Sequence, residues 1–553
     1  MRSPLRAAPT GTQRLACAAL LSLASALPFA ACSQAERDFD DPGATGTSTT
    51  SCEPGTSAPC YSGPEGTEDV GACASGTMEC NAEGTGYGAC AGEVLPAEDA
   101  CATPEDEDCD GAPKACPLDA VWARGFLSEG FYPYPIVAAD AAGNVTLAGG
   151  FDGSLDLGNG QIFTAPDTDE IDAFVIQLGP DGAHRWSRHF GGLGRQAIAA
   201  LDVDASGNVV VAGSFTDQID YGTGVQTAQG SADMVVLKLG GDGSLIWGRV
   251  FGGATDELAT AVALDPAGQV VIGGNFSGSV SLGGNLLTSA GGSDVLVMKL
   301  AASGSPVIYA KGFGGVSYEY LRGVDADAAG SAFVTGTFND TIDFGTGPLT
   351  TAGQEDIFLA KLDSGGNVAF SQRFGDALND EEPDVAVSGP GDILLTGYFQ
   401  GIVSFGGDPL PSAGSSFFAA SYSPEGAHRW SRAFGTNESN DHFIKAARSA
   451  TGEVLLAGYF NAQVSFGGDA LTITGPPGDD ADPFLAKLDA DGAHIASRGF
   501  GTPVPEAFFD VAVDGEGASI AAGLSIGGAI DLGTGPLPSA DGMVTFLVGK
   551  FAP

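Results

Sequence analysis

The sequence carries carboxylates whose spacing could bind a cation. In the stretch EDEDCDG, Asp106, Asp108 and Asp110 alternate with other residues and are followed by Gly111. Alternate carboxylates that end in Gly form the first half of a calcium loop, because hard oxygen ligands surround the ion and Gly allows the turn. The second half is missing, since Pro117 stands where a bidentate Glu would be. A calcium site and a solvated acidic turn both stay open, and the missing half favours the turn.

A second group of acidic residues recurs at one position, six residues beyond a repeated Phe. Along the chain this position holds Tyr132, Gln196, Glu257, Glu319, Asp380, Asn440 and Glu506, and Asp441 lies beside Asn440. A ring of the carboxylates would form a ligand-binding face for Ca²⁺ or a basic ligand; its members are Glu257, Glu319, Asp380, Asp441 and Glu506. Alternatively, each residue caps backbone amides of the adjoining unit. Every copy would share that need, so the recurrence favours capping.

The histidines do not suggest a catalytic base. The chain has five His; His184, His428 and His494 share one repeat position, and His189 lies in a repeated aromatic segment. His442, beside Asp441, is a weak candidate for a base. The sequence contains no GxSxG, HExxH, phosphate-binding loop or dinucleotide fingerprint. A binding or structural role is therefore favoured over a glycan hydrolase or lyase, and no catalytic residue is assigned.

Eight cysteines lie close together before residue 120: Cys52, Cys60, Cys73, Cys80, Cys90, Cys101, Cys109 and Cys116. An even number in a short segment of an exported chain predicts disulfides, although the sequence leaves the pairing open. A zinc site is disfavoured because this segment has no CxxC pair and no His. We expect a cysteine-rich domain over residues 52–119 that depends on its bridges, since it is poor in residues for a core.

The N-terminal residues 1–31 are typical of an export signal, with three Arg before a short apolar stretch. Small residues precede Cys32, which indicates a bacterial lipoprotein signal with Cys32 as the lipidated residue; an ordinary cleaved signal is the alternative. Residues 32–51 are polar and rich in Gly, Ser and Thr, as in a flexible tether. The expected location is outside the cytoplasm, anchored to a membrane, as at the outer membrane or cell surface.

The overall charge restricts the choice of partner. With 23 basic and 69 acidic residues, the chain has a formal charge of −46. Such a charge disfavours nucleic acid and anionic lipid surfaces. We therefore expect the ligand to be a protein or a glycan, which the sequence does not identify. We expect the propeller to be monomeric. The sequence indicates no certain cofactor.

Residues 120–553 repeat one pattern. Segments ending in AGxF or its variants occur at 140–151, 204–215, 265–276, 327–338, 388–399, 449–460 and 514–525, so their ends are 61 to 65 residues apart. Each unit is predicted to form four strands, of which the third is apolar on both faces. Seven such units indicate an all-β fold, a seven-bladed β-propeller over residues 120–553.

The order of the strands predicts which residues meet. With the strand before the DxxG turn innermost and the aromatic strand outermost, the DxxG turns share one face and the longer loops share the other. Variable loops on a rigid scaffold usually carry the binding site. Basic residues recur at two positions. One is in the third strand, at Lys238, Lys299, Lys361, Lys487 and Lys550, and the other is in the aromatic strand, at Arg124, Arg188, Arg249, Lys311, Arg432 and Arg498. We expect ion pairs between these residues and the group Asp172, Asp233, Asp294, Asp356 and Asp482.

The aromatic segments are out of step with the repeats at both ends. Copies occur at 122–126, 186–190, 247–251, 309–313, 370–374, 430–434 and 496–500, and none follows the last apolar strand, 546–551. The first copy, WARGF, precedes every complete unit. We therefore expect residues 122–126 to pair with 546–551 as the outer strand of the last blade and to close the ring.

These motifs resemble a known family. FGG, the segment GNVxVAGxF and the strand DxFVxKLD occur in the same order and spacing as in SBBP-type seven-bladed β-propeller repeat lipoproteins of the myxobacterial type, over residues 120–553. The resemblance implies a propeller and little about activity. Separately, the stretch around Asp106 resembles the DxDCDG motif of a metal-binding repeat of bacterial surface proteins, over about a dozen residues.

Overall fold

The computed structural model describes residues 51–97, 106–111, 116–130, 134–165, 170–435, 443–476 and 480–553. Every element of regular secondary structure among these residues is a β-strand. The chain divides into two compact units, Met1–Pro113 and Lys114–Pro553. Among the described residues, no helix is long and apolar enough to span a membrane.

The cysteine-rich unit is held together by disulfides. Its two strands, β1 (Ser57–Cys60) and β2 (Gly76–Glu79), are antiparallel. The disulfides are Cys52–Cys80, Cys60–Cys90 and Cys73–Cys109. Cys116, in the second unit, is also disulfide-bonded, and Cys101 lies outside the described residues. These bridges indicate a protein of the extracytoplasmic environment, where disulfides persist.

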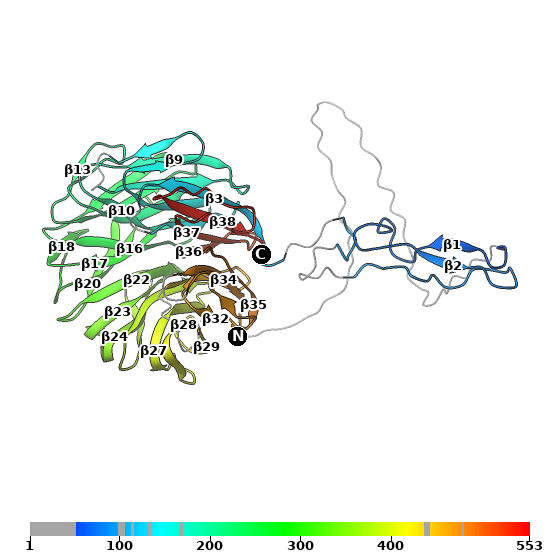
Figure 1. Cartoon of the computed structure of the whole chain (residues 1–553). Coiled ribbons are helices and arrows are strands. Elements are labelled where there is room, and N and C mark those ends of the chain that lie inside the picture. Colours follow the sequence, from blue (N-terminus) through cyan, green and yellow to red (C-terminus); the bar gives the residue numbers. More distant parts are fainter. Residues whose placement is uncertain are drawn as a thin grey trace, which may run out of the picture. The chain divides into compact units, whose positions relative to one another are not determined.

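The second unit is a seven-bladed β-propeller of four-stranded antiparallel blades (Figure 1). Blades 1 to 3, from inner to outer strand, are β4 (Ile136–Ala139), β5 (Val145–Phe151), β8 (Asp172–Leu178), β9 (His184–Phe190); β10 (Gln196–Val203), β11 (Val209–Phe215), β14 (Asp233–Leu239), β15 (Leu245–Phe251); and β16 (Glu257–Leu264), β17 (Val270–Phe276), β20 (Asp294–Leu300), β21 (Val307–Phe313). Blades 4 and 5 are β22 (Glu319–Ala326), β23 (Ala332–Asp343), β24 (Pro348–Leu362), β25 (Val368–Phe374); and β26 (Asp380–Val387), β27 (Ile393–Val403), β28 (Leu410–Tyr422), β29 (His428–Phe434). Blades 6 and 7 are β30 (Phe443–Arg448), β31 (Val454–Phe460), β34 (Asp482–Leu488), β35 (His494–Gly499); and β36 (Glu506–Val513), β37 (Ser519–Ile526), β38 (Val544–Phe551), β3 (Ala120–Ser128).

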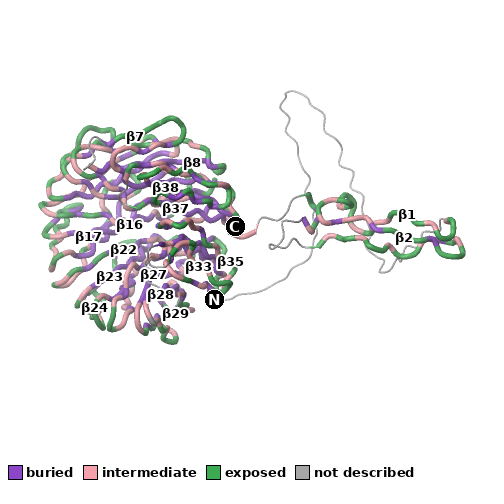
Figure 2. The backbone as a smooth tube through the Cα atoms, viewed as in Figure 1, coloured by how far each residue is buried: buried purple, intermediate pink, exposed green. Residues whose placement is uncertain are grey.

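Short hairpins extend from the second and third strands. They are β6 (Ser154–Asp156) with β7 (Ile162–Thr164), β12 (Gln218–Ile219) with β13 (Gln226–Thr227), β18 (Ser279–Leu282) with β19 (Asn285–Thr288), and β32 (Gln463–Val464) with β33 (Leu471–Thr472). The hydrophobic core lies between neighbouring blades; Met234 of blade 2, for example, packs in one cluster with Met298 of blade 3. Figure 2 shows the buried residues along the strands and the exposed ones mainly on connecting loops.

Each aromatic outer strand fastens its blade to the next one. Trp122 Nε1 donates to Pro180 O of blade 1 at 2.8 Å, and Arg124 Nε donates to Gly182 O at 2.9 Å. A Cβ on Gly182 would lie 2.7 Å from the Trp122 ring, and Gly182 has φ +72. Only Gly satisfies both conditions. The same contact recurs for Trp186, Trp247 and Trp430, whose Nε1 atoms donate to Gly241 O, Ala302 O and Ala490 O.

The predicted closure of the ring is confirmed. The first strand, β3, pairs antiparallel with the last, β38, with Phe126 opposite Phe546 (Figure 1, where blue β3 lies beside red β38). The chain just before β3 also replaces a turn that the other blades possess. Arg498 of blade 6 donates to Leu118 O at 3.3 Å, in the way that Arg124 contacts Gly182, and Leu118 has φ +67.

The predicted partners of the repeated Lys are wrong. In four of the five described pairs the Lys meets the Asp of the DxxG turn, as in Lys299–Asp265 at 2.9 Å. In the fifth, Lys487 meets Glu453, which directly follows the Ser449–Gly452 turn. The full set is Lys238–Asp204, Lys299–Asp265, Lys361–Asp327, Lys487–Glu453 and Lys550–Asp514. In an antiparallel ladder this Lys is at the end of its strand next to the turn. The strand-starting aspartates, such as Asp233, are at the other end.

Candidate functional site at the mouth of the central channel

The inner strands surround a central channel, as the predicted strand order requires. A cavity of about 290 Å³ lies in it, lined by residues from all seven blades, among them Val137, Asp202, Ala263, Asp325, Asp384, Ala446 and Asp510. Inner strands of neighbouring blades do not form a sheet with one another. Their backbone amides therefore need other partners.

Aspartates in the channel supply these partners. Asp202 accepts a hydrogen bond from the amide of Leu264 in the next blade at 2.7 Å. In the same way, Asp325 accepts a hydrogen bond from the amide of Val387 at 2.6 Å. Asp510 accepts one from the amide of Val137 at 2.8 Å. Burial raises the pKa of Asp202 to about 6 and the pKa values of Asp325 and Asp510 to about 7. These carboxyls therefore link the inner strands of neighbouring blades.

A larger basin opens where the inner strands begin, and we call it the mouth. It has a volume of about 440 Å³ and is lined by Tyr134, Thr260, Leu321, Arg322, Glu382, Tyr398, Phe443, Lys445, Tyr459 and Phe509. A volume of this size is within the range of ligand pockets. The lining residues come from blades 1, 3, 4, 5, 6 and 7, so the complete ring is needed to form the mouth.

β-Bulges in the inner strands project side chains into the mouth. The pairing register shifts around Thr260 in β16, around Arg322 in β22, around Glu382 in β26 and around Phe509 in β36. A bulge leaves one residue without a cross-strand partner and redirects its side chain. Glu382 also has φ +48, a conformation that is uncommon for a residue other than Gly. The repeated bulge thus gives these blades a variable residue at the mouth.

Aromatic rings form one wall of the mouth. Tyr134 stacks on Phe509 with ring centroids 3.9 Å apart and planes within 6°. Phe443 lies against both Phe509 (5.4 Å) and Tyr459 (6.3 Å). Tyr134 remains 50 % exposed, so half of its surface is accessible from the solvent. This wall offers a flat, rigid surface to a ligand.

Charged and hydroxyl groups form a second wall of the mouth. Arg322 pairs with Glu382 at 3.0 Å, and Lys445 pairs with Asp384 at 2.9 Å. The Tyr398 hydroxyl donates to Glu381 at 2.6 Å. Burial, that hydrogen bond and nearby carboxylates raise the pKa of Tyr398 far above its usual value. Tyr398 is therefore not a base near neutral pH.

One carboxyl beside this wall has an altered pKa. Burial, followed by repulsion from Glu381 and Glu382, raises the pKa of Glu355, and the positive charge of Arg322 opposes the shift. The carboxylates beside the mouth therefore repel one another, and a bound cation would reduce this repulsion.

The predicted ligand-face residues that the structure describes, Glu257, Glu319, Asp380 and Glu506, are not among the residues that line the mouth. Glu257, Glu319 and Asp380 are 0 % exposed and Glu506 is 1 % exposed, whereas Asp441, Tyr132 and Asn440 lie outside the described residues. Three of these carboxylates accept amides of their own loops: Glu257 from Gly253, Asp380 from Asp376 and Glu506 from Thr502. The amides belong to the loop of the residue itself rather than to the adjoining blade.

The sequence did not point to the mouth, because several of its residues lie three positions after the predicted repeat position. Counted from Glu257, Glu319 and Glu506, the third residue onward is Thr260, Arg322 or Phe509. This position differs in chemistry from blade to blade, while the predicted position is nearly uniform. Variation at a repeat position was the signal that could have identified the site.

The predicted calcium residues lie together in the cysteine-rich unit. Ligand atoms of Asp106, Asp108 and Asp110 all fall within 4.8 Å of one another. Both carboxylate oxygens of Asp106 already accept backbone amides, from Asp110 at 3.1 Å and Gly111 at 2.9 Å. This pattern is that of a hydrogen-bonded acidic turn, and calcium binding there stays a prediction.

The described histidines have structural surroundings. His189 contacts Asp172 at 2.5 Å, and His428 and His494 contact Ser431 and Ser497 of their own strands. His442 lies outside the described residues. None of these contacts reaches the mouth.

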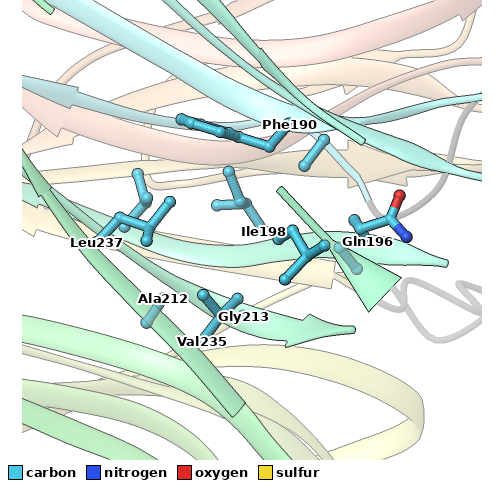
Figure 3. A pocket seen from close by; sticks show the side chains of 11 residues that line it. Phe190, Gln196, Ile198, Ala212, Gly213, Val235 and Leu237 are labelled. Carbon is cyan, nitrogen blue, oxygen red and sulfur yellow. The ribbon is translucent and has the colours of Figure 1, made fainter. Parts of the chain in front are cut away.

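A small apolar cavity lies between blades 1 and 2 (Figure 3). Phe190, Ile198 and Leu237 line it, with Gln196 at one end. Its volume is about 10 Å³, near the lower limit for one water molecule. It is a packing void and too small for a ligand.

Comparisons with known proteins identify no family for this chain. No protein-family model matches the chain, and no curated protein matches it. Among solved structures, a europium-containing methanol dehydrogenase is 10 % identical with a TM-score of 0.33, covering 78 % of this chain and 93 % of that one. The polysaccharide lyase Uly1 is 9 % identical (TM-score 0.39; 77 % and 90 % covered), and YCF48 bound to a D1 peptide is 10 % identical (0.36; 80 % and 98 %). Likeness at this level identifies no family and no activity.

Proposed function

We propose that this protein is an extracytoplasmic binding protein whose ligand site is the mouth of the propeller channel. The observation that carries the proposal is the basin of about 440 Å³, which is lined by both stacked aromatic rings and ion-paired side chains. Concave sites with aromatic faces and a few convergent polar groups are typical of ligand pockets.

The test is a binding screen of the full chain against arrays of peptides and saccharides. We expect a ligand whose binding is lost or strongly weakened in Tyr134→Ala. The matched control is Ile402→Ser, because Ile402 is 64 % exposed and is not among the residues that line the mouth. A ligand that binds Tyr134→Ala as well as the parent would place the site elsewhere and overturn the proposal.

The cellular setting belongs to the same proposal. Export with lipidation at Cys32 would attach the protein to a membrane, and its disulfides agree with an extracytoplasmic location. Labelling of cells with a palmitate analogue should modify the parent but not Cys32→Ala. Membership of the SBBP-type propeller lipoproteins is supported by the seven ordered repeats of the sequence.

A glycan-active enzyme is the second candidate. The observation in its favour is the raised pKa of Glu355 beside Arg322, because a carboxyl with a raised pKa can act as a general acid. Incubation with polysaccharides distinguishes the two candidates. Product formation that is lost in Glu355→Gln would support the enzyme, and saturable binding without products would support the binding protein.

A further inference from the structure

The charges around the mouth are unequal, and this inequality indicates the chemistry of the ligand. Two cations, Arg322 and Lys445, lie in the mouth. Each is already paired with a carboxylate, Glu382 or Asp384. Two further carboxylates beside the same wall, Glu355 and Glu381, have no ion pair among the described residues. The wall therefore carries an excess of negative charge.

The aromatic wall is suited to the same kind of ligand. The faces of Tyr and Phe rings carry negative partial charge and attract ammonium and guanidinium groups. The protein itself shows such contacts, with the Arg322 guanidinium 5.8 Å from the centroid of Tyr320. Aromatic rings together with surplus carboxylates are complementary to a cation on an apolar stem.

Exposed apolar residues continue the surface beyond the mouth. Tyr320 (38 % exposed) and Tyr318 (54 %) stack on each other at 6.4 Å, and Val316 in the same loop is 78 % exposed. A free small amine would not reach them, whereas a peptide that inserts one side chain would cover them. The formal charge of −46 would attract a basic partner from a distance.

We propose that the mouth binds a basic peptide segment of a protein partner, with an Arg or Lys side chain inserted between the aromatic wall and the carboxylates. This inference rests on the proposed function and specifies its ligand. The inserted cation lies against the Tyr134 ring and beside Glu381 and Glu355. The neighbouring peptide residues pack on Tyr318 and Tyr320.

The test uses calorimetric titration of the full chain with acetylated, amidated tetra-arginine and tetra-lysine, and with a neutral oligosaccharide. We expect peptide binding that weakens with added salt. Tyr134→Ala should weaken it by about fivefold, the value of one exposed cation–π contact. Glu381→Gln should weaken it as well, because it removes one of the surplus charges. Ile402→Ser and the exposed Glu516→Gln serve as controls, and thermal melting checks that each variant folds.

Arg322→Ala gives the sharpest discrimination. For a cationic ligand, this change removes a competing charge and releases Glu382, so peptide affinity should rise severalfold. For a saccharide, the same change removes a hydrogen-bond donor and should lower affinity. Saccharide binding that Tyr134→Ala abolishes, without peptide binding, would overturn this inference but leave the mouth as the binding site. Equal binding of free arginine amide and tetra-arginine would overturn the peptide component, and no binding by any probe would overturn both proposals.

Discussion

One repeat position, six residues after the repeated Phe, holds different side chains in different blades, and these side chains form different hydrogen bonds. In blade 2, Gln196 Nε2 donates to the backbone oxygens of Leu193 (3.1 Å) and Gln218 (2.7 Å). In blade 3, Glu257 takes this place. Its Oε1 is buried and has no hydrogen-bond partner in the part of the chain that the structure describes. A protonated Glu257 can donate as the Gln196 amide does, whereas an ionised one cannot.

Stability should therefore fall as the pH rises. Burial raises the pKa values of Glu257, Glu319, Asp380 and Glu506 to about 7; in the unfolded chain they are about 4. Between these values the folded state binds more protons than the unfolded state, so the free energy of unfolding decreases with pH, by ~1–2 kcal/mol for each group. Urea unfolding at pH 5 and pH 8 measures this change. Greater stability at pH 8 would contradict the assignment.

A single substitution isolates one of these groups. Glu257→Gln copies the residue of blade 2 and should keep the fold. We expect this variant to be more stable than the parent at pH 8 and to differ little at pH 5, because it removes only the group that loses its proton. Glu516→Gln is the matched control, since Glu516 is exposed. If Glu257→Gln and Glu516→Gln increase the free energy of unfolding equally, the effect comes from the change in net charge.

The buried ion pairs give a second prediction at this scale. Lys299 and Asp265 have side chains 0 % and 3 % exposed, and Lys299 Nζ also donates to Gly330 O of the next blade at 2.6 Å. Lys299→Met leaves a buried carboxylate without its partner and should cost ~3–5 kcal/mol of unfolding free energy. The double variant with Asp265→Asn should recover part of this loss. If the single and the double variant lose the same free energy of unfolding, the hydrogen bond from Lys299 to Gly330 contributes more to stability than the ion pair with Asp265.

The position of a side chain within the repeat was easier to predict from the sequence than its interaction partner. The sequence places Lys299 and Asp294 in one strand and suggests that such residues pair, yet Lys299 reaches the turn residue Asp265. Likewise, the position of Glu257 was visible, but not that its side chain turns back to Gly253. Both outcomes depend on side-chain direction and register within the blade, which the periodicity of the pattern does not contain.

Strands and turns were predicted more completely, because their signals are local and repeated. The four strands of each unit, their order and the DxxG turns follow from alternation of apolar residues and from Gly. The bulges around Thr260 and Arg322 were not predicted. A bulge adds one residue to an otherwise regular strand, and here its sequence differs in every blade. The candidate site was therefore missed while the elements that carry it were found.

The turn before β3 provides a prediction at the scale of elements. The outer strand of blade 6 carries Ala496 where most other blades have an aromatic ring, and Leu118 occupies the place that Gly takes opposite such rings. Leu118 is 1 % exposed and packs in the same cluster as Ala496. Leu118→Ala should cost ~2–3 kcal/mol of unfolding free energy, because it leaves a cavity. Leu193→Ala, at a position 57 % exposed, is the control; equal losses would show that Leu118 is not a core residue of the seam.

At the scale of the whole molecule, one strand from the start of the propeller completes the ring. β3 supplies the outer strand of blade 7 by pairing with β38, and Trp122 fastens that blade to blade 1. Without β3, the edge of β38 would be unpaired and the contact with blade 1 would be lost. The mouth uses Phe509 of blade 7 and Tyr134 of blade 1, so ligand binding should also depend on this closure.

Two variants of the full chain separate the need for the strand from the need for its place in the sequence. Deletion of residues 120–126 should lower the free energy of unfolding by more than about 4 kcal/mol, because an entire strand and its contacts disappear. In the second variant, a Gly-Ser linker of matching length replaces residues 117–128, which are moved to follow Pro553 through a short turn. That turn is feasible because Leu118 N donates to Ala552 O at 3.1 Å and Ala552 N donates to Asp119 O at 2.7 Å. The relocated strand should restore most of the stability and the stacking of Tyr134 on Phe509. A deletion variant as stable as the parent would refute closure by β3, and failure of the relocated strand to restore stability would show that the connection to the preceding chain is itself required.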